Sequence, residues 1–223
     1  MSKSFFINPI RRIVYNNPSI SSLENVVKHP KNVLILDRDG TLTVNDPEYL
    51  HETEKCKFTD GACEALKKLQ EKDFIIIFNT SQSGIARGYF LEEQFHVFMD
   101  WIVDYLYKHG VESVAVYYCP HHPEKGIGEY KIDCECRKPK PGMILQAFLD
   151  FNINPEKDNV WLIGDGNRDV ESARLASEKI KTIQTETQGI KGSDEEEKVK
   201  PDFKAKDLAE AIEIILKGRQ QRR

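Results

Sequence analysis

Val33-Leu34-Ile35-Leu36-Asp37-Arg38-Asp39-Gly40-Thr41 is the stretch that decides the fold. Its four branched apolar residues, without polar alternation, predict a strand buried on both faces, as in a parallel sheet covered by helices. The run ends on Asp37 and Asp39, and open α/β sheets bind ligands at the carboxyl ends of their strands. Extended backbone would turn both carboxylates the same way, where they repel unless a divalent cation lies between them or one is protonated. A strand ending in a simple Asp-Gly turn is the alternative that this stretch leaves open.

The composition is that of a soluble globular chain with one core. The chain has 223 residues, 39% hydrophobic and 30% charged, with a formal net charge of −4 at pH 7. It has no apolar run near the roughly 20 residues that span a bilayer, and residues 1–8 make a poor signal peptide, so we expect a cytoplasmic protein. The net charge gives no reason to expect nucleic acid or a membrane as partner, and we expect a monomer.

Strands alternate with helices along the rest of the chain. We expect further strands at 74–78, 114–118, 160–163 and 181–184, with helices opening at Asp60-Gly61 and over 91–110, 144–151 and 207–216. This rhythm predicts an α/β, doubly wound, three-layer Rossmann-like fold with a parallel sheet. Residues 32–217 form the expected domain, with a polar flap over 43–60 and a solvated acidic loop at 194–197. Residues 1–31 form an arm that packs on the body or reaches a partner, and residues 218–223 form a tail.

The most specific local pattern is a set of soft metal ligands in two close pairs. The chain has five cysteines, and Cys119, His121, Cys134 and Cys136 match the Cys3His donor set of a closed, structural zinc site. Cys-x-His matches the spacing of Cys-x-Cys, which favours His121 over His122. Zinc would fix the irregular loop 123–133, which has little apolar surface of its own. Free cysteines in a surface loop are the alternative.

Polar residues also follow the other predicted strands. Thr80, Ser81, Gln82 and Ser83 follow the second, with hydroxyls and backbone N–H groups that suit an oxyanion. Arg137 and Lys138 follow the cysteine pair, and could offset phosphate charge, although a solvated basic loop is the alternative. Asp165 follows the fourth strand, so three carboxylates from separate strand ends predict an Mg2+ site. Asp169 would bind the metal through water or cap a helix that begins near Val170.

Together, Asp37-x-Asp39-Gly40-Thr41, Thr80, Lys138 and Gly164-Asp165 resemble the four motifs of the haloacid dehalogenase-type phosphatases. Residues 83–88, the cysteine cluster and Cys136-Arg137-Lys138-Pro139 are similar to the D-glycero-D-manno-heptose 1,7-bisphosphate phosphatases and their histidinol-phosphatase relatives, over about residues 32–217.

The resemblance implies a phosphatase that acts on a small phosphorylated sugar. It makes Asp37 the nucleophile of an aspartyl-phosphate intermediate and Asp39 the general acid and base. Mg2+ would be held by Asp37, by Asp39 through its backbone carbonyl, and by Asp165. Thr80 and Lys138 would hold the transferring phosphoryl group, while Ser81, Gln82, Ser83 and Arg137 would place the substrate.

Three departures from the heptose phosphatases concern the substrate more than the reaction. Ser81 stands where they have Asn, Gly166 stands where they have Lys, and the flap is one residue longer between Thr41 and Tyr49. Histidinol phosphate therefore stays open as an alternative substrate. A non-catalytic, zinc-stabilised binding domain is the alternative of another class, against which the intact Asp37 and Asp39 argue.

Overall fold

A computed structural model of the protein describes residues 10–14, 30–189 and 199–220. Most of the predicted arm, nearly all of the acidic loop region and residues 221–223 lie outside the described residues. Within the described part, no helix is long and apolar enough to cross a bilayer.

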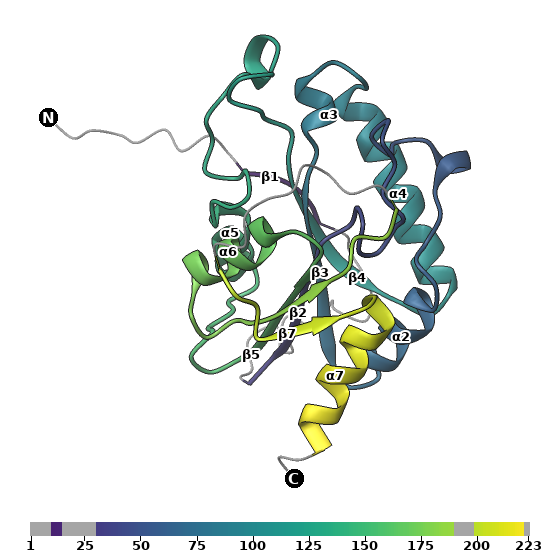
Figure 1. Ribbon diagram of the computed structural model, residues 1–223, viewed down its shortest axis with the longest axis vertical. Helices are drawn as coiled ribbons and strands as arrows, with labels where there is room; N and C mark the ends of the chain where they lie inside the picture. Colours follow the sequence, from purple (N-terminus) through teal and green to yellow (C-terminus); the bar gives the residue numbers. More distant parts are fainter. Residues whose placement is uncertain (1–9, 15–29, 190–198, 221–223) are drawn as a thin grey trace, which may run out of the picture.

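A seven-stranded sheet forms the centre of the described structure (Figure 1). Its spatial order is β1-β4-β3-β2-β5-β6-β7, and every neighbouring pair is parallel except β1 with β4. The central strand, β2, begins one residue earlier than the apolar run predicts. The strands are β1 (Arg11–Val14), β2 (Asn32–Leu36), β3 (Phe74–Ser81), β4 (Ser113–Cys119), β5 (Asn159–Gly164), β6 (Lys181–Thr185) and β7 (Phe203–Ala205).

Helices cover both faces of the sheet, which confirms the doubly wound, three-layer fold. In β2, Leu34 and Leu36 face a core built with α2, α4 and α7, whereas Val33 and Ile35 face a core built with α5 and α6. Alternate residues of one apolar run thus fill two cores, because successive side chains of a strand point to opposite faces. The helices are α2 (Ala62–Gln70), α3 (Ser83–Ala86), α4 (Glu92–Lys108), α5 (Gly142–Asp150), α6 (Asn167–Ala176) and α7 (Leu208–Gln220).

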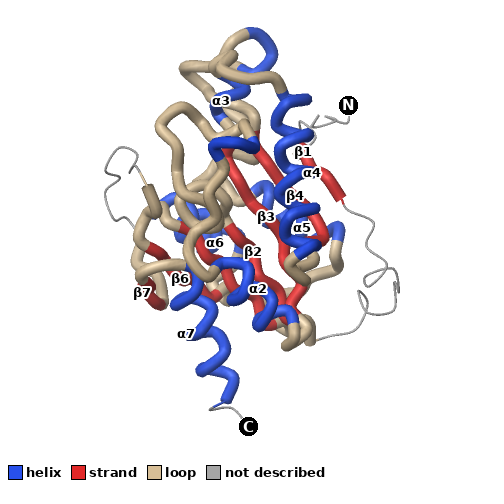
Figure 2. The backbone as a smooth tube through the Cα atoms, turned by 90° about the vertical axis from the view of Figure 1, so that its right-hand side faces the viewer, coloured by secondary structure: helices blue, strands red, loops and turns tan. Residues whose placement is uncertain are grey.

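Two short strands, β1 and β7, were not predicted, and they lie at opposite edges of the sheet (Figure 2). Each is too short to give a periodic signal, so only the edge strand that it pairs with defines it. β1 makes the sheet mixed rather than purely parallel. It also shows that the described part of the predicted arm packs on the body.

Side chains on both faces of the sheet hold β1 in register. Tyr118 pairs with Arg11, and its hydroxyl donates to Glu92 at 2.7 Å, while Arg11 lies 3.5 Å from the same carboxylate. On the other face, Tyr117 pairs with Arg12, and both contact Asp150, at 2.7 and 2.9 Å. Each cross-strand pair therefore shares one carboxylate from a covering helix.

Several elements are longer than predicted, which matters for the site. β3 continues through Thr80 to Ser81, and β4 ends on Cys119, so these residues belong to strands rather than loops. The short helix α3 begins at Ser83, and the flap contains a 3-10 turn, η1 (Thr53–Lys55); a second, η2 (Gly128–Tyr130), lies in the loop 123–133. Lys31 also belongs to the body, since its backbone N–H donates to Asp158 at 2.7 Å.

Because β2 is buried on both faces, truncating one of its side chains should lower the free energy of unfolding considerably. Leu34→Ala should lower the free energy of unfolding by about 2–5 kcal/mol, since the fully buried side chain leaves a cavity. The matched control is Leu149→Ala on α5, where the side chain is 77% exposed and the expected change is below about 0.5 kcal/mol. Urea denaturation would measure both, and equal effects would contradict the described packing.

Candidate functional site

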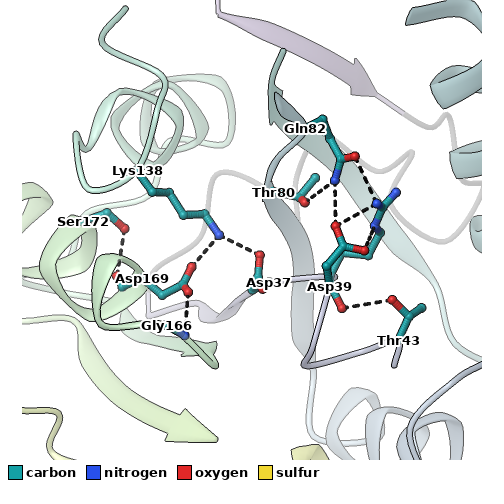
Figure 3. Close-up of polar contacts among 10 residues, drawn as sticks. Asp37, Asp39, Thr43, Thr80, Gln82, Lys138, Gly166, Asp169 and Ser172 are labelled. Atoms are coloured by element: carbon teal, nitrogen blue, oxygen red, sulfur yellow. Dashed lines mark hydrogen bonds and ion pairs between the residues drawn. The ribbon is translucent and has the colours of Figure 1, made fainter. Parts of the chain in front are cut away.

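The carboxyl ends of the strands bring the predicted site residues to one edge of the sheet. Asp37 follows β2, Thr80 lies near the end of β3, and Asp165 follows β5, in a parallel arrangement that places their ends side by side. Figure 3 shows Asp37 between Lys138 and Asp39, with Thr80 above them in this view. Three segments far apart in the sequence thus converge on one point.

Lys138 makes the central contact of this edge. Its Nζ donates to Oδ1 of Asp37 at 2.7 Å and also to Oδ1 of Asp169 (Figure 3). All three residues are buried, so the charges have little solvent to stabilise them and depend on one another. Burial lowers the pKa of Lys138, but Asp169 and Asp37 outweigh burial and raise it, so the ammonium stays charged.

Three carboxylates form a group that could hold a metal ion. Oxygen atoms of Asp37, Asp165 and Asp169 all lie within 4.8 Å of one another. Burial raises the pKa of Asp37, helped by the other two carboxylates and opposed by Lys138. Burial and the charge of Asp169 raise the pKa of Asp165 to about 6. When all three carboxylates are ionised, they and the Lys138 ammonium leave two negative charges, and an all-oxygen donor set of that charge fits Mg2+.

The turn at Gly40 lies close to the Asp165 carboxylate. Gly40 has a φ of +83°, and a Cβ there would collide with the Asp165 carboxylate, so only glycine fits both the turn and the contact. Thr187, in the loop after β6, hydrogen-bonds the Asp165 carboxylate and lowers its pKa. Sequence reasoning missed Thr187, because nothing in the sequence indicates that this loop folds back over the Asp37 turn.

The Asp39 carboxylate accepts from Arg38 and Gln82, whereas that of Asp37 accepts from Lys138. The strand ends at Leu36 and the chain turns, so the side chains of neighbouring Arg38 and Asp39 meet. Both carboxylate oxygens of Asp39 accept from Arg38, each at 2.8 Å. Gln82 Nε2 donates to Oδ2 of Asp39 at 2.9 Å and to Oγ1 of Thr80 at 2.8 Å (Figure 3). The Asp39 carboxylate is therefore outside the three-carboxylate group.

Arg38 is the residue beside Asp39 that sequence reasoning most clearly missed. It is 1% exposed, and its guanidinium lies 5.6 and 5.2 Å from the ring centres of Phe95 and Phe98. These rings belong to the helical aromatic stripe predicted as core, and that stripe also orients the arginine. The sequence does show an arginine between two aspartates. The direction of the Arg38 side chain, however, depends on the turn after β2, which the sequence pattern did not predict.

Asp169 acts as a helix cap and as a partner of Lys138. The helix α6 begins at Asn167, three residues before the predicted start near Val170. Asp169 Oδ2 accepts the backbone N–H of Gly166 at 3.1 Å, in the third position of the helix. Of the two predicted alternatives, the cap is therefore present, while the carboxylate also belongs to the group that could hold a metal.

Among the described contacts, none joins the remaining predicted substrate residues to one another. Ser81 Oγ is buried without a hydrogen-bond partner among the described residues, and Ser83 opens α3. Arg137 Nη1 donates to the carbonyl of His121 at 3.3 Å, and its side chain is partly exposed. Gln82 instead contacts Asp39 and Thr80, two of the residues predicted to be catalytic.

The four predicted zinc ligands come together in one buried cluster. Their ligand atoms all lie within 4.8 Å of one another, and all four residues are buried. The Sγ atoms of Cys134 and Cys136 are 3.0 Å apart, and Nδ1 of His121 is 3.4 Å from Sγ of Cys136. The Nδ1 of His122 instead accepts backbone N–H groups of residues 124 and 125. Three thiols and one imidazole at this spacing fit a structural zinc ion.

Comparisons with known proteins agree with this geometry. A family model described as "HAD-hyrolase-like" matches residues 135–211. The D-glycero-beta-D-manno-heptose-1,7-bisphosphate 7-phosphatase of Pasteurella multocida is 46% identical over 151 residues, which are 68% of this chain and 79% of that protein. The enzyme of the same name from Escherichia coli K12 is 38% identical over 150 residues, covering 67% of this chain and 77% of that protein.

A solved structure shares the fold. The D,D-heptose 1,7-bisphosphate phosphatase of B. bronchiseptica, complexed with magnesium and phosphate, superposes with a TM-score of 0.70 at 26% identity. The match covers 84% of this chain and 99% of that one. With its Asp37 centre, its cysteine cluster and these relatives, the chain belongs to the heptose-bisphosphate phosphatase family of haloacid dehalogenase-like hydrolases.

Proposed function

We propose that the protein hydrolyses D-glycero-β-D-manno-heptose 1,7-bisphosphate at the 7-phosphate and releases the heptose 1-phosphate. The observation that carries the proposal is the buried contact of Lys138 with Asp37, beside two further carboxylates at the strand ends. A nucleophile, a cation for the phosphoryl oxygens and a metal-type donor set then lie together, which is what phosphoryl transfer requires. The names of the relatives support the heptose substrate.

In this proposal Asp37 is the nucleophile. A carboxylate oxygen of Asp37 forms a bond to phosphorus while the bond from phosphorus to the sugar oxygen breaks, leaving an aspartyl phosphate. Lys138 Nζ, already bound to Asp37, and the Thr80 hydroxyl would contact the transferring oxygens and stabilise their charge. Ser81, Ser83 and Arg137 would contact the rest of the substrate.

Asp39 would protonate the leaving sugar oxygen and then take a proton from the water that attacks phosphorus, which regenerates Asp37. Arg38 and Gln82 donate hydrogen bonds to its carboxylate and so hold it in place. Gln82 therefore acts through Asp39 and Thr80, as a positioning residue.

Asp37, Asp165 and the backbone carbonyl of Asp39 would hold Mg2+, which when bound neutralises carboxylate and phosphate charge. Cys119, His121, Cys134 and Cys136 would hold zinc. Because Arg137 and Lys138 directly follow Cys136, zinc would position both cations without touching the substrate.

Phosphate release from a panel of substrates tests the proposed function. The purified protein with Mg2+ should turn over heptose 1,7-bisphosphate with a higher kcat/KM than histidinol phosphate or p-nitrophenyl phosphate. A preference for histidinol phosphate would overturn the substrate, and no release from any of the three compounds would overturn the enzymatic proposal.

Asp37→Asn should abolish turnover, because an amide of nearly the same size cannot act as the nucleophile. We expect kcat to fall by at least about 1000-fold, with the fold and zinc content retained. Phosphate release and circular dichroism would measure both. Asp104→Asn, on the exposed face of α4, is the control. Activity above about one per cent of the native rate, well short of what losing a nucleophile costs, would exclude the covalent mechanism.

Cys134→Ser should lower zinc content and thermal stability together, because a metal-bound loop loses its main constraint. We expect Tm to fall by more than about 5 °C and activity to fall with it. Metal analysis and calorimetry would measure these changes. Cys63→Ser is the matched control, since this buried cysteine of α2 lies outside the cluster. A zinc-free variant with native Tm and activity would contradict the zinc site.

Gln82→Met should reduce kcat by about tenfold with a small change in KM, because the side-chain hydrogen bonds with Arg38, Asp39 and Thr80 are lost while the side-chain volume is kept. Steady-state kinetics would separate the two constants. Gln70→Met is the control, since the Gln70 side chain makes hydrogen bonds too, to the backbone of residue 112, but lies in α2 away from the site. A large rise in KM alone would indicate a direct substrate contact instead.

A further inference from the structure

The Arg38 side chain joins three parts of the site. Its Nε and Nη2 donate to the two carboxylate oxygens of Asp39, each at 2.8 Å. Nη2 also donates to Oε1 of Gln82 and to the backbone carbonyl of Leu50, both at 3.1 Å. Leu50 belongs to the flap, and Gln82 directly follows β3. One guanidinium therefore contacts the proposed acid and base, the end of the neighbouring strand, and the flap.

Ring contacts hold the flap against the segment between α3 and α4. The ring of Tyr49 lies 5.1 Å from that of Tyr89, and the ring of His51 stacks on that of Phe90 at 4.5 Å. Leu50, between the two flap rings in sequence, is buried. Tyr49 has a φ of +64°, which a tyrosine rarely adopts, so these surroundings must hold the backbone in that conformation. The packed flap thus fixes the Leu50 carbonyl as an acceptor for the guanidinium.

Burial restricts the Arg38 guanidinium to these partners. Its side chain is 1% exposed, whereas that of Asp39 is 24% exposed. The guanidinium lies near the rings of Phe95 and Phe98, and its Nη1 is 3.5 Å from Sδ of Met99, all on α4. A buried cation is stable only if it is paired and hydrogen-bonded. Asp39 supplies the only carboxylate among the described contacts of this guanidinium, so the pair should keep one orientation.

We propose that Arg38 is a positioning residue that couples the flap to the general acid. The inference rests on the proposed function, in which Asp39 protonates the leaving sugar oxygen. Because the same guanidinium binds the Asp39 carboxylate and the Leu50 carbonyl, the carboxylate keeps its orientation only while the flap is in place. Arg38 thus makes proton donation to the leaving group depend on the position of the flap, and it acts through Asp39 rather than on the substrate.

Kinetics of Arg38→Met on two aryl phosphates test the link to the acid. Methionine keeps an unbranched side chain beside the α4 rings but loses the side-chain hydrogen bonds. Phenyl phosphate and p-nitrophenyl phosphate differ in the leaving group, and phenol leaves less readily than p-nitrophenol without a proton. The kcat/KM for phenyl phosphate should fall at least about tenfold more than that for p-nitrophenyl phosphate, because general acid catalysis contributes about 100-fold or more.

Arg174→Met is the matched control. Nη2 of Arg174 lies 2.8 Å from a carboxylate oxygen of Asp202, and Nη1 donates to the backbone carbonyl of Ile180 at 2.7 Å, but these partners lie at the amino ends of β7 and β6. The control should leave the ratio of the two kcat/KM values unchanged. Arg38→Lys keeps the buried cation but not the forked contact, so its ratio should change in the same direction by about threefold or more. A native ratio in either folded Arg38 variant, or an equal fall on both substrates, would overturn the inference.

Hydrogen exchange of the flap separates this inference from the proposed function. Loss of the bond to the Leu50 carbonyl should speed exchange of backbone amides in residues 44–58 about tenfold in Arg38→Met, and Arg174→Met should leave it unchanged. The measurement needs no substrate. If the native protein releases no phosphate from any compound, the proposed function fails while exchange still decides whether Arg38 holds the flap. Native exchange of these amides in a folded Arg38→Met protein would overturn the inference by itself.

Discussion

The buried contact of Lys138 with Asp37 and Asp169 is the interaction on which the rest of this edge depends. Three buried charged groups are stable only if each keeps its partners, because an isolated buried charge costs several kcal/mol. Each partner comes from a different part of the chain: the turn after β2, the loop after the cysteine cluster, and the first turn of α6. The ion pairs therefore fix the relative positions of all three segments.

The cysteine cluster would hold in place the loop that carries Lys138. Lys138 follows Cys136 by two residues, in a loop that has little apolar surface with which to hold a conformation. A zinc ion bound to β4 through Cys119 would tie that loop to the sheet, so the ammonium could reach Asp37 at low entropic cost. Zinc, which would order the loop, and Mg2+, which would assist the reaction, would therefore act at different distances from the substrate.

Sequence patterns predicted the features that local chemistry determines. The apolar run of β2, the helix spacing and the Cys-x-His with Cys-x-Cys pattern all led to elements that the structure contains. The patterns failed where tertiary contacts decide: the strands β1 and β7, the turn that sends Asp39 toward Arg38, and the approach of Thr187 to Asp165. The strands β1 and β7 and the contact of Thr187 depend on partners that are distant in sequence. The contact of Asp39 with Arg38 depends on a turn that breaks the alternation of the strand.

The antiparallel pairing of β1 with β4 bears on how the sheet avoids self-association. A bare edge strand presents unpaired N–H and C=O groups that can pair with another chain and seed aggregation. Parallel strands cannot close their own edge by a tight hairpin, so β4 receives its cover from the start of the chain. The opposite edge ends on β7, which has three residues and offers little template. The strand β1 therefore covers an edge of β4 that could otherwise pair with another chain.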